Sequence, residues 1–110
     1  MPHYMFQAKY SVDAFGAMLK EPQDRTAAGR AITEAAGGKL DALYFCFGDY
    51  DVMAIIEAPD DHTMASAAMV LAASGAFSGG KTTKLMTGAE AKSAMEKAGS
   101  IAASYTPVTG

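Results

Sequence analysis

The chain has few of the residues that mark disulfide-rich or nucleic-acid-binding proteins. Its 110 residues include no tryptophan and a single cysteine, Cys46. One cysteine cannot form a disulfide within the chain. Only Arg25 and Arg30 are arginines, and nine basic residues against twelve acidic ones give a net charge of -3. Because the lysines are scattered and form no basic stripe that could contact phosphates, we expect no nucleic-acid partner.

Long apolar runs are also missing. No stretch reaches the ~18 strongly apolar residues of a membrane-spanning helix, and the first residues do not show the basic and then apolar pattern of an export signal. We therefore expect a cytoplasmic protein with no membrane partner. Cys46 lies in the aromatic run 43–47 with no activating neighbour in sequence, which favours a buried small hydrophobe over a catalytic thiol.

The hydrophobic content is high in number but low in bulk. Half of the residues are hydrophobic, and 23 of those 55 are alanine. Apolar burial contributes about 25 cal/mol per Å², so small side chains contribute little each. The composition is too apolar for a disordered chain, yet the core that one copy can form on its own is expected to be modest.

The hydrophobic pattern predicts the element order β-α-β-β-α-β with one further helix. We expect strands at 3–10, 39–47, 50–58 and 81–86, and a loop at 75–80. Helices are expected after a Ser11 cap, from Pro22 to Ala36, from 61 to about 74 after an Asp60 cap, and from a Thr87 capping box to about Ala98. This order is that of the ferredoxin-like α+β fold, an antiparallel sheet with helices on one face. Residues 1–98 are expected to form the domain and residues 99–110 a flexible tail.

Two of the predicted strands are apolar on both of their faces. The runs 42–47 and 52–56 do not alternate, although a sheet with helices on one face should alternate apolar and polar residues. One chain has no further element to cover the second face. We therefore expect a second copy to cover it, in a homodimer or a larger homo-oligomer.

The first strand alternates, and its polar side supplies the candidate site. Pairing this strand with the third one antiparallel sets His3 opposite Glu57 and Lys9 opposite Asp51, with Gln7 between them. These five residues either pair with one another or line a ligand pocket between the sheet and its partner. The pair of His3 and Glu57 has the chemistry of an acid–base unit. No residue is assigned a catalytic role.

Two other patterns are set aside. Residues 75–82 match the spacing of a P-loop, but an alanine-rich helix precedes them and a strand follows, which reverses the context that a phosphate needs. The only histidines, His3 and His62, are far apart in sequence, and metal sites usually need three or four ligands. We expect neither a metal nor a cofactor.

The stretch 44–61 resembles the GYD domain family, named for a Gly-x-Tyr-Asp hairpin. That hairpin is here Gly48, Asp49, Tyr50 and Asp51. The resemblance includes the aromatic first strand and the strand near 83–86, and it covers most of residues 3–98. It implies a small ferredoxin-like domain of the dimeric α/β barrel kind, in a family of largely unknown function. The hairpin predicts a positive φ at Gly48 or Asp49, and leaves Asp51 to stabilise the turn, pair with Lys9 or contact a ligand.

Three functions remain open at this point. The first is a homo-oligomeric domain that binds a small molecule in a cleft at the sheet face, near His3, Gln7 and Lys9. The second is a cofactor-independent enzyme of the dimeric α/β barrel type, acting on a small metabolite with His3 or Asp51 as the acid–base group. The third is a purely structural assembly protein without a pocket.

Overall fold

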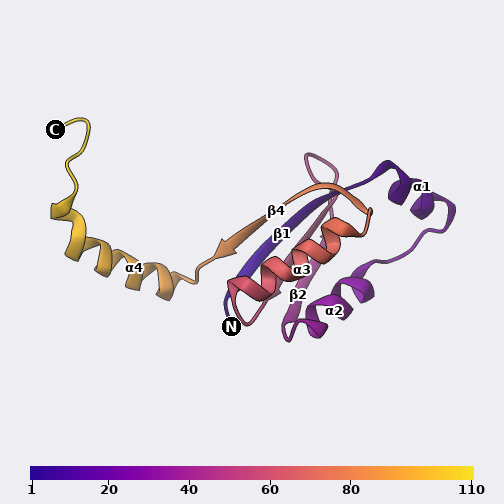
Figure 1. The fold of residues 1–110 in the computed structure, drawn as a ribbon, viewed down its shortest axis with the longest axis horizontal. Helices are drawn as coiled ribbons and strands as arrows, with labels where there is room; N and C mark the ends of the chain where they lie inside the picture. The colour runs from indigo at the N-terminus through magenta and orange to yellow at the C-terminus, as the bar shows by residue number, and fades with distance from the viewer.

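Four antiparallel strands form one sheet in the order β2-β3-β1-β4 (Figure 1). The structure is a computed structural model and describes residues 1–110. The strands are β1 (His3–Tyr10), β2 (Lys39–Phe45), β3 (Val52–Glu57) and β4 (Phe77–Leu85). The helices are α1 (Val12–Lys20), α2 (Thr26–Ala35), α3 (Asp61–Ala73) and α4 (Gly88–Ile101), and a short 3-10 turn, Ala102–Ser104, follows. The predicted ferredoxin-like α+β fold is confirmed.

The helix starts that depend on local hydrogen bonds are confirmed. The Ser11 hydroxyl accepts from the backbone N–H of Ala14 at 3.1 Å and begins α1. The Asp60 carboxylate accepts from the N–H of Thr63 at 2.8 Å and begins α3. Both caps satisfy an amide that has no partner within the helix.

Two helix boundaries differ from the prediction. The helix predicted from Pro22 begins at Thr26, because the Asp24 carboxylate accepts from both the backbone N–H and the hydroxyl of Thr26, at 2.9 and 2.6 Å. These bonds hold residues 24–26 in a local turn, so the helix starts only after it. The last helix, α4, continues past Ala98 to Ile101.

The loop predicted at 75–80 is shorter in the structure, and its second part, 77–80, belongs to a strand. β4 begins at Phe77, and both Gly79 and Gly80 pair with β1. A Cβ atom at Gly80 would lie 3.0 Å from the carbonyl oxygen of Gln7, so the glycine permits a close approach of two backbones. Long-range pairing with β1 therefore overrides the turn preference of the two glycines.

The tight turn predicted at Gly48 and Asp49 is wrong. β2 ends at Phe45 and β3 begins at Val52, so residues 46–51 form a longer connection. Neither Gly48 nor Asp49 has a positive φ. A longer connection does not need the mirror-image dihedrals of a two-residue hairpin turn.

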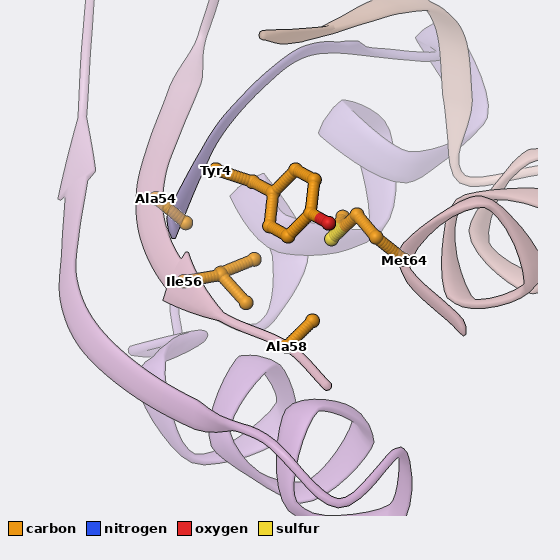
Figure 2. Packing of buried hydrophobic residues seen from close by; sticks show 5 residues of the cluster. All are labelled: Tyr4, Ala54, Ile56, Ala58 and Met64. Carbon is orange, nitrogen blue, oxygen red and sulfur yellow. The ribbon is translucent and has the colours of Figure 1, made fainter. Parts of the chain in front are cut away.

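The predicted register of β1 against β3 is confirmed, and it places the core on one face of the sheet. Tyr4 lies opposite Ile56, Phe6 opposite Ala54, and Ala8 opposite Val52. Helices α2 and α3 lie over this face (Figure 1). Figure 2 shows the Tyr4 ring and the Met64 side chain of α3 pointing toward each other across one end of the core, and the buried cluster there consists of Tyr4, Ala54, Ile56, Ala58 and Met64.

The core of the single chain is small, as the alanine content predicted. Only ten of the 110 residues are buried. Helix α4 extends away from the sheet and carries the C-terminus to the far end of the molecule (Figure 1). None of the helices has the length and apolarity that crossing a bilayer requires.

Candidate functional site

The face of the sheet opposite α2 and α3, here called the outer face, carries the predicted site residues. β1 contributes His3, Met5, Gln7 and Lys9, and β3 contributes residues such as Ile55, opposite Met5. No helix of the chain lies over this face of the sheet (Figure 1). The outer face therefore combines apolar side chains with ionisable ones, as the strand pattern predicted.

At one end of the outer face, His3 and Glu57 form the predicted pair. The imidazole Nε2 of His3 lies 3.7 Å from a carboxylate oxygen of Glu57. A third residue, Asp41, completes this cluster, because a β-bulge between Leu40 and Ala42 shifts the register of β2 at that point. One imidazole nitrogen of His3 and one carboxylate oxygen each of Asp41 and Glu57, the atoms that could bind a metal, lie within 4.8 Å of one another.

Two carboxylates and an imidazole are ligands that a divalent cation accepts. In this cluster, however, the ammonium group of Lys39 lies 3.8 Å from a carboxylate oxygen of Asp41. A cation of the chain thus already pairs with one of the two carboxylates, and the cluster carries no proposal of a metal site. Asp41 escaped the sequence analysis because nothing in the sequence marks the bulge that places it.

At the other end of the outer face, Asp51 fastens the β2–β3 connection to β1. It is buried, and its carboxylate accepts from the backbone N–H of Tyr10 at 2.9 Å. Its own N–H donates to the carbonyl of Ala8 at 2.9 Å. The ammonium of Lys9 lies 3.8 Å from the second carboxylate oxygen. Asp51 thus extends the β1–β3 pairing and pairs with Lys9.

The five predicted residues are not brought together at one point. His3 and Lys9 stand six residues apart on one strand, which corresponds to about 20 Å. Gln7 lies near the middle of the strand, opposite Met53. The structure therefore forms two separate pairs, His3 with Glu57 and Lys9 with Asp51, on one face.

The two largest cavities lie on the other face of the sheet, beneath the helices. One, the α3–β4 groove, has a volume of about 420 Å³ and runs between α3 and β4. The second, the inner cavity, has a volume of about 240 Å³ and lies between α2, α3 and the sheet. None of the five predicted residues lines either of these two cavities.

The inner cavity is apolar, and Tyr10 and Phe77, two members of an aromatic cluster, line it. Twelve of its sixteen lining residues are hydrophobic. The Tyr10 ring stacks on Phe77 at a centroid distance of 4.9 Å and on Phe45 at 5.8 Å. Phe15 meets the edge of the Tyr10 ring at 5.7 Å. Such ring pairs add stabilisation beyond their buried area.

Arg25 is the only charged residue that lines the inner cavity. Burial raises the pKa of the Tyr10 hydroxyl, and the neighbouring guanidinium of Arg25 opposes that shift. Arg25 also donates to the side chain of Gln23 at 2.7 Å. The sequence analysis missed Arg25 because it placed this residue inside a long helix, whereas Arg25 immediately precedes α2.

A comparison with models of protein families shows which family the chain belongs to. The model of the GYD domain matches residues 4–95, which is most of the chain. The chain belongs to the GYD domain family. The resemblance stated from the hairpin and strands is thereby confirmed for this GYD domain.

A solved structure adds support for the fold of this GYD domain. The crystal structure of MtbAldR is similar over 78% of this chain and 53% of that chain, with 17% identity and a TM-score of 0.58. The crystal structure of FFRP-DM1 is similar over 78% of this chain and 100% of that chain, with 10% identity and a TM-score of 0.49. The GYD domain thus spans about half the length of MtbAldR, and the likeness concerns the fold alone. A comparison with curated proteins finds no match.

Proposed function

We propose that this GYD domain binds a small apolar carboxylate in the inner cavity and acts as a self-associating, ligand-binding domain. The observation that carries this proposal is a mostly apolar cavity of about 240 Å³ with one guanidinium in its wall. Small-molecule sites are typically apolar hollows in which a few polar groups fix the orientation of the ligand. The cavity volume lies just below the usual range of about 300–1,000 Å³, which suits a small ligand.

The polar groups of the cavity indicate the charge of the ligand. The hydroxyl of Thr33 donates to the carbonyl of Gly29 at 2.7 Å, and that of Ser74 donates to the carbonyl of Leu71 at 2.6 Å. Both hydroxyls are therefore engaged within their own helices. The guanidinium of Arg25 retains donors for a ligand, and it matches a carboxylate in shape and charge.

Titration with benzoate, followed by amide chemical shifts, tests the ligand proposal. Benzoate is expected to shift signals around the inner cavity. The neutral isostere benzamide is expected to bind at least about tenfold more weakly than benzoate. Arg25→Ala should remove the preference for benzoate, whereas Arg30→Ala, which changes the other arginine of the chain, should retain it. Absence of benzoate binding, or shifts confined to the outer face, would contradict the proposal.

The outer face supports the self-association part of the proposal. This face is a sheet surface that no helix covers (Figure 1), where Met5, Met53 and Ile55 are only partly buried and Tyr44, opposite Met53, is exposed. Apolar residues on an uncovered sheet face are typical of a surface that packs against a second copy. A dimeric α/β barrel, in which two such faces meet, is the arrangement that we propose. A monomeric domain in solution would contradict it.

A second candidate function, a cofactor-independent enzyme, is favoured by the pair of His3 and Glu57. A carboxylate at 3.7 Å can orient an imidazole and stabilise its charged form during proton transfer. In such an enzyme Gln7 and Lys9 would contact the substrate along the outer face. If any turnover is found, His3→Ala and Glu57→Gln should both reduce it, and unchanged rates in both variants would remove this candidate.

A further inference from the structure

Helix α4 leaves the domain without packing on it. The helix begins at a capping box in which Glu90 N–H donates to the Thr87 hydroxyl at 3.1 Å and Thr87 N–H donates to the Glu90 carboxylate at 3.0 Å. These two bonds fix its direction where β4 ends. Figure 1 shows α4 running away from the sheet with no strand or other helix beside it, and the element that packs most closely on it is the 3-10 turn that follows it.

The exposed α4 carries a continuous apolar stripe. Met95 and Ile101 are 70% and 61% exposed. An isolated helix of 14 residues is marginally stable in water, so a helix of this kind gains its stability from packing of its apolar side. Small residues share the stripe, and the opposite side of the helix is polar. The α4 stripe consists of Ala91, Ala94, Met95, Ala98 and Ile101.

A surface that fits this stripe lies on the α3–β4 groove. Its floor is formed by small and apolar side chains, among them Ala68 and Ala72 of α3 and Gly80 of β4. The α3 helix remains apolar on its solvent side, where Met69 is 69% exposed. A helix that is apolar around its circumference is typical of a buried helix. Small side chains on both surfaces allow two helices to approach closely.

The path of the chain keeps α4 away from its own groove. The groove is lined by residues 77–82, near the start of β4, whereas α4 begins beyond the opposite end of that strand. Only Met86 and Thr87 connect β4 to α4, and this short connection directs α4 away from the sheet (Figure 1). A second copy of the chain is the partner that presents the same groove without this restriction.

The chain exposes more surface than a folded monomer of its mass, and the excess is comparable to the area that a chain buries in a homodimer. A folded monomer of 11.4 kDa is expected to expose about 5,800 Å², whereas this chain exposes 7567 Å². The difference, about 1,800 Å², lies within the range of area that each chain buries in an obligate homodimer. The radius of gyration, 17.7 Å, likewise exceeds the value of about 13 Å for a compact domain of this length.

We propose that α4 is an exchanged arm, whose apolar stripe packs into the α3–β4 groove of a second copy. This inference rests on the proposed self-association and is independent of the ligand in the inner cavity. Exchange in both directions gives a two-fold assembly in which each chain covers the other's groove. The arm thereby buries Met95 and Ile101, the largest side chains of the stripe.

Disulfide trapping between different chains tests the exchange. In a Cys46→Ala background, one sample carries Ala94→Cys in α4 and another carries Ala68→Cys in α3. After mixing and mild oxidation, the 94–68 disulfide between the two kinds of chain is expected to form in excess of a matched pair in which Ala27→Cys of α2 replaces the α3 cysteine. A chain that carries both Ala94→Cys and Ala68→Cys is oxidised in parallel. A yield between chains no higher than that of the control pair, or a 94–68 disulfide that forms only within the doubly substituted chain, would overturn the proposal.

Two charge substitutions in the full chain separate the arm from the outer face. Met95→Glu should raise the dissociation constant of the assembly by about tenfold or more, while Ser93→Glu on the polar side of α4 should leave it nearly unchanged. If Ile55→Glu on the outer face dissociates the assembly and Met95→Glu does not, self-association stands and the exchanged arm is wrong. Benzoate binding measured on the same variants reports separately on the inner cavity.

Discussion

At the scale of single residues, the buried carboxylate of Asp51 explains part of the signature hairpin. Asp51 accepts from the Tyr10 N–H and pairs with Lys9, so it continues the β1–β3 pairing where the strand itself has ended. A role in fold stability follows from its burial and its backbone partner. The family's Gly-x-Tyr-Asp sequence thus carries an anchor, and the aspartate of that sequence lies outside both large cavities.

Asp51→Ala is expected to lower the free energy of unfolding by about 1–3 kcal/mol, because it leaves the buried N–H of Tyr10 without a partner. Asp49→Ala, in the exposed part of the same connection, is expected to change it by less than about 0.5 kcal/mol. Urea denaturation followed by circular dichroism measures both. Equal effects of the two substitutions would contradict the anchoring role.

Tyr4 makes stability depend on alkaline pH. Burial raises the pKa of its hydroxyl to about 12, helped by the hydrogen bond that it donates to the carboxylate of Asp61. The unfolded chain ionises this group near pH 10, so the contribution of Tyr4 is complete below pH 10 and is lost as pH rises toward 12. Tyr4→Phe should therefore flatten the fall in stability between pH 10 and 12.

The matched control for Tyr4 is Tyr105→Phe, which changes an exposed tyrosine near the C-terminus. It should leave the alkaline fall in stability as steep as in the unchanged chain. Thermal unfolding at pH 9, 10, 11 and 12 compares the three proteins. A Tyr4→Phe profile that follows the unchanged chain would show that burial of this hydroxyl has no part in the pH dependence.

At the scale of elements, local signals were readable and long-range ones were not. Ser11, Asp60 and Thr87 were predicted as helix caps, because each cap depends on residues three positions away. The start of β4 and the bulge at Asp41 were missed, because pairing with a distant strand sets both. The register of β1 on β3 was predictable, since a shift by one residue would expose Tyr4 and Phe6.

The ion pairs of the outer face could be predicted from the sequence, and the inner cavity could not. The pairs of His3 with Glu57 and Lys9 with Asp51 follow from the strand register. The inner cavity does not, because it depends on how far α2 and α3 stand from the sheet. Spacing between helices and sheet is a property of packed side chains and leaves no pattern along the sequence.

The two adjacent glycines of β4 give a matched test of that strand. Gly80→Ala should destabilise the domain by about 1–3 kcal/mol, because its Cβ would lie 3.0 Å from the backbone oxygen of Gln7. Gly79→Ala has open space and should be neutral or stabilising by up to about 1 kcal/mol. Thermal unfolding of both variants measures the difference. Equal melting temperatures would contradict the close pairing of β4 with β1 at Gly80.

At the scale of the whole molecule, the chain has the surface of an incomplete assembly. The outer face is uncovered, the α4 stripe is uncovered, and only ten residues are buried, eight of which form the hydrophobic core. The small core and the uncovered outer face follow from the sequence, in which alanine replaces bulk and two strands are apolar on both sides. A second copy can cover both surfaces, and no further segment of this chain does.

Sedimentation equilibrium at micromolar concentration tests this central claim most directly. The account predicts a folded species whose mass is a multiple of 11.4 kDa, two or more, with no stable monomer during dilution. Circular dichroism on the same samples shows whether folding and assembly are lost together. A folded species of 11.4 kDa that persists at these concentrations would contradict the account.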